Sequence, residues 1–87
     1  MARRRVTHTG KDRNGDITSL CAHGEWWSPR KKGDAIQDIE SGANSYYVRW
    51  QDGKETEIRV VNGSIGKYLR TDRVFRLRNN LDDLSDC

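Results

Sequence analysis

Alternating apolar and polar positions are clearest in residues 46–61. Apolar or aromatic side chains occupy positions 46, 48 and 50, and the alternation resumes after a short polar stretch at 56, 58 and 60. A period of two residues is typical of strands with one buried face. The segment therefore predicts two antiparallel strands joined by a hairpin loop, with Tyr46, Val48 and Trp50 facing the core and Tyr47 and Arg49 facing solvent.

The length of the hairpin loop decides which residues face each other. A two-residue Asp-Gly turn would pair Val48 with Glu57 and place a charge on the core face. A three-residue loop over residues 51–53 pairs Val48 with Thr56 instead. We therefore predict the longer loop, with Gly53 in the left-handed conformation that glycine adopts easily. The same register gives three further pairs: Tyr46 with Ile58, Arg49 with Glu55, and Tyr47 with Glu57.

The segments before this hairpin predict a strand pair and a helix. Residues 2–9 and 16–22 form strands around a turn rich in Asp, Asn and Gly. The helix begins after either Ser28 or Asp34, and Asp34 is favoured because an earlier start would place Gly33 inside the helix, at a cost of about 1 kcal/mol. Gly42 is expected to end the helix as a left-handed cap.

A final strand is predicted after the hairpin. Asn62-Gly63 is typical of a tight turn, and residues 64–71 then form a strand with Gly66 as a bulge or bend. Residues from 72 onward fit neither period consistently, so they are left irregular.

These elements predict a small α+β fold: an antiparallel sheet made of a β-hairpin, a helix and a three-stranded meander, with the one helix packed on one face. The chain of 87 residues forms a single domain over 1–87, in which residues 1–3 and 85–87 are the most prone to fraying. The expected core is Val6, Ile17, Leu20, Trp26, Ile36, Ile39, Tyr46, Val48, Trp50, Ile58, Val60 and Leu69.

The charged residues are arranged in blocks. The net charge is +3, and basic residues dominate 1–32 and 58–80 while acidic residues dominate 33–57. Basic blocks on one face would suit a nucleic-acid backbone, and an exposed Trp27 beside them could stack on bases. The basic segments are Arg3 to Arg5, Arg30 to Lys32 and Arg70 to Arg78, and the possible binding surface is Trp27, Arg30, Lys31, Lys32, Arg70, Arg73, Arg76 and Arg78.

The sequence also predicts where the chain resides and the state of its two cysteines. No apolar run is long enough to span a bilayer, and the polar residues after Arg5 do not resemble a signal peptide. We therefore expect a cytoplasmic protein without a membrane partner. In that reducing compartment Cys21 and Cys87 should be free thiols.

Four residues are weak candidates for a metal site: Cys21, His23, His8 and Cys87. Structural zinc sites usually take ligands in two tight pairs, and only one such pair occurs here, so we expect no metal and no cofactor. Cysteine, serine, paired-carboxylate and phosphate-loop signatures of catalysis are not recognisable. The chain is therefore not expected to be an enzyme.

Several short motifs follow one another along nearly the whole chain: Gly15-Asp16-Ile17-Thr18, Cys21, Trp26, residues 36–42, Tyr46-Tyr47-Val48, Tyr68-Leu69-Arg70-Thr71 and the ending Asn80-Leu81-Asp82-Asp83-Leu84-Ser85-Asp86-Cys87. In this order they resemble the motifs of a bacterial family called domain of unknown function 3892. The resemblance implies a bacterial, intracellular, single-domain protein, without implying an activity. Ser85, where proline is common in the family, and the basic segment 72–79 depart from its pattern.

The leading functional prediction is a small, non-catalytic binding or interaction module with an unknown protein partner. The alternative is a nucleic-acid-associated protein that uses the basic segments. A metal-binding protein or a thiol-dependent enzyme is the weakest alternative. Whether two copies pair depends on which strand lies at an edge of the sheet.

Overall fold

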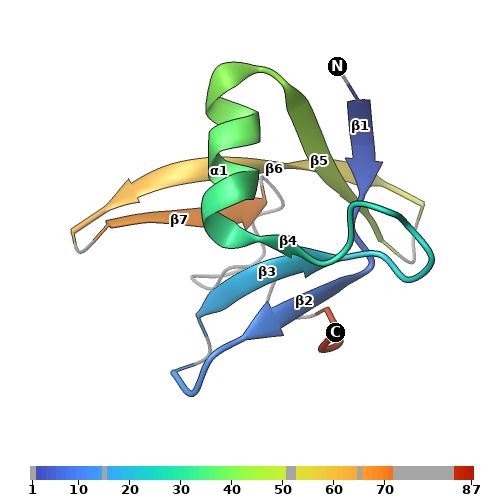
Figure 1. Ribbon diagram of the computed structural model, residues 1–87, viewed down its shortest axis with the longest axis horizontal. Helices are drawn as coiled ribbons and strands as arrows, with labels where there is room; N and C mark the ends of the chain where they lie inside the picture. Colours follow the sequence, from blue (N-terminus) through green and yellow to red (C-terminus); the bar gives the residue numbers. More distant parts are fainter. Residues whose placement is uncertain (1, 15, 51–52, 65, 72–83) are drawn as a thin grey trace.

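The computed structural model describes residues 2–14, 16–50, 53–64, 66–71 and 84–87. Over these residues the chain forms seven strands and one helix (Figure 1). Their bounds are β1 Ala2–Arg5, β2 His8–Lys11, β3 Ile17–Cys21, β4 Arg30–Lys31, α1 Lys32–Ser41, β5 Asn44–Arg49, β6 Glu55–Gly63 and β7 Gly66–Thr71.

The strands form two sheets that share the helix. A four-stranded sheet has the order β1-β5-β6-β7, and a three-stranded sheet has the order β2-β3-β4. All pairs are antiparallel except β1 with β5, which is parallel. Helix α1 packs against β5, β6 and β7 of the first sheet and against β3 and β4 of the second (Figure 1). The predicted α+β fold with one helix and a β5-β6-β7 meander is confirmed.

The central hairpin has the predicted register. Val48 pairs with Thr56, Arg49 with Glu55, and Tyr47 with Glu57. Gly53 has a φ of 86°, and its N–H donates to the carbonyl oxygen of Trp50 over 2.9 Å. The rule that keeps charge off the core face therefore identified the three-residue loop.

The predicted first strand is divided between the two sheets, which the sequence analysis did not anticipate. Residues 2–5 pair with β5, whereas only residues 8–11 pair with β3. Two successive backbone hydrogen bonds carry the chain across: Val6 N–H donates to the oxygen of Tyr47 over 2.8 Å, and Thr7 N–H donates to that of Cys21 over 2.9 Å. Residues 2 and 3, expected to fray, are thus strand residues.

The helix begins earlier than predicted. Strand β4 pairs with Leu20 and Ser19 and leads directly into α1, so the helix starts at Lys32 and contains Gly33. Asp34 does not cap the helix but lies in its first turn, where its negative charge interacts favourably with the positive end of the helix dipole. Gly42 ends the helix as predicted, with a φ of 78°.

The turn after β6 also lies later than predicted. Asn62 and Gly63 are still strand residues, and Gly63 pairs with Gly66 of β7. A Cβ atom at Gly63 would lie 2.9 Å from the carbonyl oxygen of Gly66, so this close pairing requires glycine.

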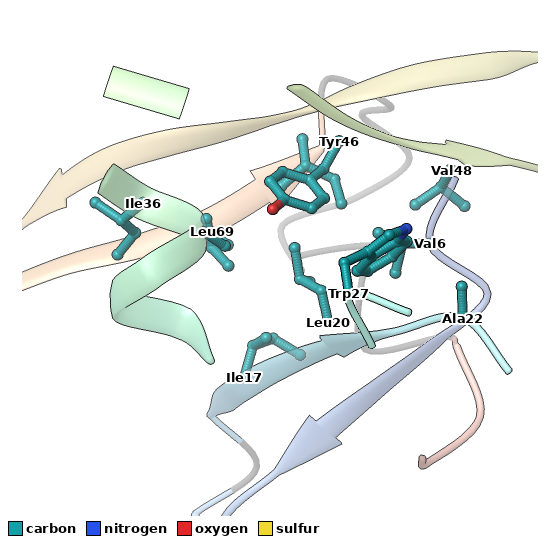
Figure 2. Packing of buried hydrophobic residues seen from close by; sticks show 11 residues of the cluster. Val6, Ile17, Leu20, Ala22, Trp27, Ile36, Tyr46, Val48 and Leu69 are labelled. Atoms are coloured by element: carbon teal, nitrogen blue, oxygen red, sulfur yellow. The ribbon is translucent and has the colours of Figure 1, made fainter. Parts of the chain in front are cut away.

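Side chains from both sheets and the helix form one core (Figure 2). Eleven of the twelve predicted core residues are buried or pack partly against this cluster, and Trp26 is the exception. Its side chain is 85% exposed, whereas Trp27 is only 7% exposed and meets Tyr46 edge-on at 5.7 Å. The predicted assignment of the buried and the exposed ring was therefore wrong.

The C-terminal residues are attached to the edge of β2. Thr9 N–H donates to the oxygen of Ser85 over 3.0 Å, and Cys87 N–H donates to that of Thr9 over 3.2 Å. Cys87 forms a disulfide with Cys21, so the prediction of two free thiols was wrong. That prediction rested on a reducing compartment, whereas the fold brings the two Cα atoms to 6.0 Å. Residues 85–87, expected to fray, therefore have backbone and covalent partners.

Within the described ranges, no helix has the length and apolar character needed to cross a membrane.

The disulfide predicts a stability that depends on reductant. It joins residues 66 apart in sequence, and a crosslink of that span restricts the unfolded chain by about 4 kcal/mol. In urea unfolding, adding a phosphine reductant should lower the free energy of unfolding by about this amount. Cys87→Ala is the matched control, because its unfolding should not respond to reductant. Two titratable thiols in the denatured, unreduced protein would contradict the pairing.

Candidate binding site

A hollow of about 510 Å³ lies between β1 and the loop that joins β3 to β4. Figure 1 shows this loop beside the C-terminal end of β1. Volumes of this size are typical of small-ligand sites. The hollow is lined mainly by cationic and aromatic side chains, among them Arg3, Arg4, Arg5, His23, Trp26 and Tyr47, with Glu25 also on its lining.

Arg4 is held between aromatic rings. Its guanidinium carbon lies 5.2 Å from the centre of the Trp26 ring, 5.5 Å from that of Trp27 and 5.6 Å from that of Tyr46. Cation–π attraction operates at these distances. The Arg4 side chain is only 10% exposed, so the exposed Trp26 ring rests over a fixed positive charge.

A buried carboxylate, Asp38 of α1, fixes Arg4 through Tyr46. Arg4 Nη1 donates to the Tyr46 hydroxyl over 2.8 Å, and that hydroxyl donates to Asp38 Oδ2 over 2.6 Å. Arg30 reaches the same carboxylate with two bonds of 3.0 Å, from Nε to Oδ2 and from Nη2 to Oδ1. We call Arg4, Arg30, Asp38 and Tyr46 the Asp38 cluster.

The cluster changes the proton affinity of its members. Burial raises the pKa of Asp38, but the hydrogen bond from Tyr46 and the bonds and charge of Arg30 outweigh burial, so its pKa is lower than the usual value. Burial and the neighbouring Asp38 carboxylate raise the pKa of Tyr46. Asp38 is therefore a charged, fully bonded anchor at neutral pH.

The two other arginines of β1 differ in their availability. Arg3 contacts Glu55 at 3.0 Å and Glu57 at 2.7 Å, and its guanidinium carbon lies 3.8 Å from the centre of the Tyr47 ring. Arg5 is exposed, and its guanidinium has no hydrogen bond or ion pair with the residues that the structure describes. Arg5 is thus the guanidinium most available to a ligand at the hollow.

The structure does not bring the predicted basic surface together. Trp27 is in the core, and Arg30 is engaged by Asp38. Lys31 and Lys32 line a different hollow, which also contains Asp12 and Asp16. Arg70 is half-buried in β7, opposite Arg59, and the predicted residues Arg73, Arg76 and Arg78 lie outside the described ranges.

The four weak metal candidates lie in two pairs. His8 and His23 stack with their ring centres 4.1 Å apart, and Cys21 and Cys87 are joined by the disulfide. Thr7 Oγ1 lies 2.8 Å from His8 Nδ1. Over the part of the chain that is described, no group of three or more His, Cys, Asp or Glu side chains is arranged to hold a metal ion. The sulfurs are bonded to each other and are not thiolate ligands in this structure.

Neither the exposure of the Trp26 ring nor the availability of Arg5 at this hollow was predicted from the sequence. Arg5 belongs to the predicted basic run at residues 3–5, but no local pattern shows that this run lies beside the Trp26 loop. That proximity depends on the parallel pairing of β1 with β5.

Comparison with protein-family models, curated proteins and solved structures gives no match. The resemblance to domain of unknown function 3892 therefore stays a prediction.

The Asp38 cluster predicts an acid-sensitive component of stability. Asp38→Asn should lower the free energy of unfolding by about 3 kcal/mol, because it leaves two arginines without their buried counter-charge. Since the folded pKa of Asp38 is below its unfolded value, its contribution is fully present above about pH 4 and is lost as the pH falls through the folded pKa. Chemical unfolding from pH 7 to pH 2 measures both effects.

Tyr46→Phe is the matched control for Asp38→Asn, since it removes one hydroxyl, keeps the carboxylate and should cost only about 1–2 kcal/mol. Equal stability of Asp38→Asn and the unsubstituted protein at pH 7 would contradict the anchor role.

The two tryptophans should differ strongly in their effect on stability. Trp27→Ala removes a buried ring and should cost about 3–5 kcal/mol. Trp26→Ala removes an exposed ring and should cost less than about 1 kcal/mol. Parallel urea titrations compare them, and a larger loss for Trp26→Ala would reverse the assignment.

Proposed function

We propose that the protein is a non-catalytic binding module whose hollow beside β1 takes an anionic ligand with a flat ring. The observation that carries this proposal is the exposed Trp26 ring lying over the fixed charge of Arg4, with the exposed Arg5 on the same hollow. A ring and a cation together suit a ligand that offers both a π face and a negative charge.

The exposure of Trp26 supports a contact surface. Large apolar side chains are mostly buried, and tryptophan and arginine are enriched among the residues that contribute most to binding interfaces. The only other large hydrophobic side chain exposed within the described residues is Tyr68, which is 39% exposed. Trp26 is therefore the strongest exposed apolar feature of this part of the chain.

The charges around the hollow support an anion over a cation. Three arginines line it, against one carboxylate, that of Glu25. Arg3 is largely neutralised by Glu55 and Glu57, whereas Arg4 and Arg30 share the single carboxylate of Asp38, so Arg4 keeps part of its positive charge. The attraction for an anion therefore comes mainly from Arg5 and in part from Arg4, so binding should be modest and should depend on the aromatic contact.

Binding is favoured over catalysis because of where the shifted pKa values lie. Strongly perturbed groups at a cleft are a common sign of catalytic sites. Here Asp38 and Tyr46 are bonded to each other in the core, where they position Arg4. Their perturbation thus has a structural cause.

The bacterial and cytoplasmic assignments remain proposals. The Cys21–Cys87 disulfide weighs against the cytoplasm, because cytosolic thiols are normally kept reduced.

Amide and side-chain NMR spectra test this function with a panel of simple anions. Tripolyphosphate, adenosine monophosphate and poly-glutamate should each be titrated at low salt, and we expect adenosine monophosphate to shift the Trp26 indole N–H and the Arg5 Nε–H resonances most. Arg5→Ala should weaken all three responses. Lys31→Ala is the matched control, because Lys31 is exposed on β4 away from the hollow. Shifts centred on Lys31 and Lys32, or none at all, would contradict the proposal.

A further inference from the structure

We infer that the ligand class of the hollow is single-stranded nucleic acid, with one base stacked on Trp26 and the adjoining phosphate at Arg5. This inference rests on the proposed function and adds the identity of the ligand. It is carried by three features of the hollow: the exposed face of one indole, the small number of available cations, and the exposed carboxylate of Glu25 beside the indole.

The exposed indole favours a strand whose bases are free. In a duplex the faces of the bases stack on each other, whereas single strands offer them to aromatic side chains. At 85% exposure, Trp26 presents its ring to solvent, and Arg4 supports it from the protein side. Stacking on an aromatic ring does not depend on the identity of the base, so this contact accepts any sequence.

The number of available cations disfavours a duplex. Binding to the backbone of a double helix depends on many phosphate contacts, each of which releases counterions. At this hollow Arg3 and Arg4 already face carboxylates, and Arg5 alone has a guanidinium without a partner among the described residues. One or two phosphate contacts are too few to hold a duplex, but they are enough to orient a strand that is also stacked.

Glu25 favours nucleic acid over an acidic peptide. Its carboxylate is exposed, lines the hollow next to Trp26, and has no hydrogen bond or ion pair with the described residues. A run of peptide carboxylates would be repelled there. The amino groups of cytosine and adenine, in contrast, donate hydrogen bonds to carboxylates such as this one. Thymine lacks such an amino group, so oligo-dT should bind more weakly than oligo-dC.

Fluorescence anisotropy with labelled eight-nucleotide strands tests the inference near 50 mM salt. We expect oligo-dC to bind at least tenfold more tightly than a duplex of the same length, and several-fold more tightly than oligo-dT. Trp26→Ala should weaken oligo-dC binding by about 5- to 150-fold, the range found for loss of one stacking contact. Arg5→Ala should lower the slope of log affinity against log salt by about 0.7.

Glu25→Gln and Lys31→Ala are the informative controls. Glu25→Gln should reduce the preference for oligo-dC over oligo-dT, while Lys31→Ala should leave affinity and slope unchanged. Because Glu25 and Lys31 are both exposed, neither substitution should disturb the fold, which unfolding curves would verify.

The outcomes separate this inference from the proposed function. Adenosine monophosphate or tripolyphosphate could shift the NMR resonances of residues that line the hollow while a duplex or poly-glutamate binds as tightly as oligo-dC. In that case the inference of single-stranded nucleic acid fails, and the proposed function as a binding module is retained. An unchanged affinity in Trp26→Ala likewise overturns the inference. If no anion shifts the hollow resonances, both proposals fail.

Discussion

The carboxylate of Asp38 is the interaction on which the rest of the structure depends. It lies on α1 and binds Arg30 of β4 and Tyr46 of β5, and through Tyr46 it reaches Arg4 of β1. The helix is thereby joined to both sheets by one buried anion. An unpaired buried charge would be strongly destabilising, so each partner is needed to offset the loss of hydration. The arrangement specifies which strands surround the helix as well as how tightly they pack.

The proposed binding site is a consequence of this anchor. Arg4 belongs both to the Asp38 cluster and to the group of rings around Trp26. Because the cluster fixes the guanidinium from inside, the outer tryptophan has a rigid, positively charged support and stays exposed. Arg4 therefore contacts both the buried carboxylate and the exposed Trp26 ring. Loss of the Asp38 carboxylate should disturb the hollow before it disturbs the distant β6-β7 pair.

Local patterns predicted the parts of the fold that depend on local rules. The hairpin register followed from keeping Glu57 off the core face, and the helix end followed from Gly42. The helical spacing also contained a signal that was not used: Asp38 lies three residues after Ala35 and next to Ile39, so it falls on the apolar face of α1. A carboxylate in that position requires a buried cation, which would have pointed to an arginine partner.

The remaining features depend on contacts between distant residues. The parallel pairing of Arg4 with Tyr46 spans 42 positions, and the disulfide spans 66. Neither contact leaves a periodic pattern in a short stretch of sequence, so neither could be predicted from local patterns. Trp26 and Trp27 lie in a turn, and which of the two rings is buried depends on where the loop meets Tyr46. The sequence therefore indicated which types of residue form the candidate site, but not where in the fold they come together.

The most direct test of the anchor is a carbon-13 NMR titration of the Asp38 carboxyl group between pH 7 and pH 2. The account predicts that Asp38 titrates below the usual range for aspartate, and that the side-chain resonances of Arg4, Arg30 and Tyr46 change over the same pH interval. Those coupled changes would show that one proton binds at the centre of the cluster. Titration at or above about pH 4 without any change at the two arginines would contradict the account.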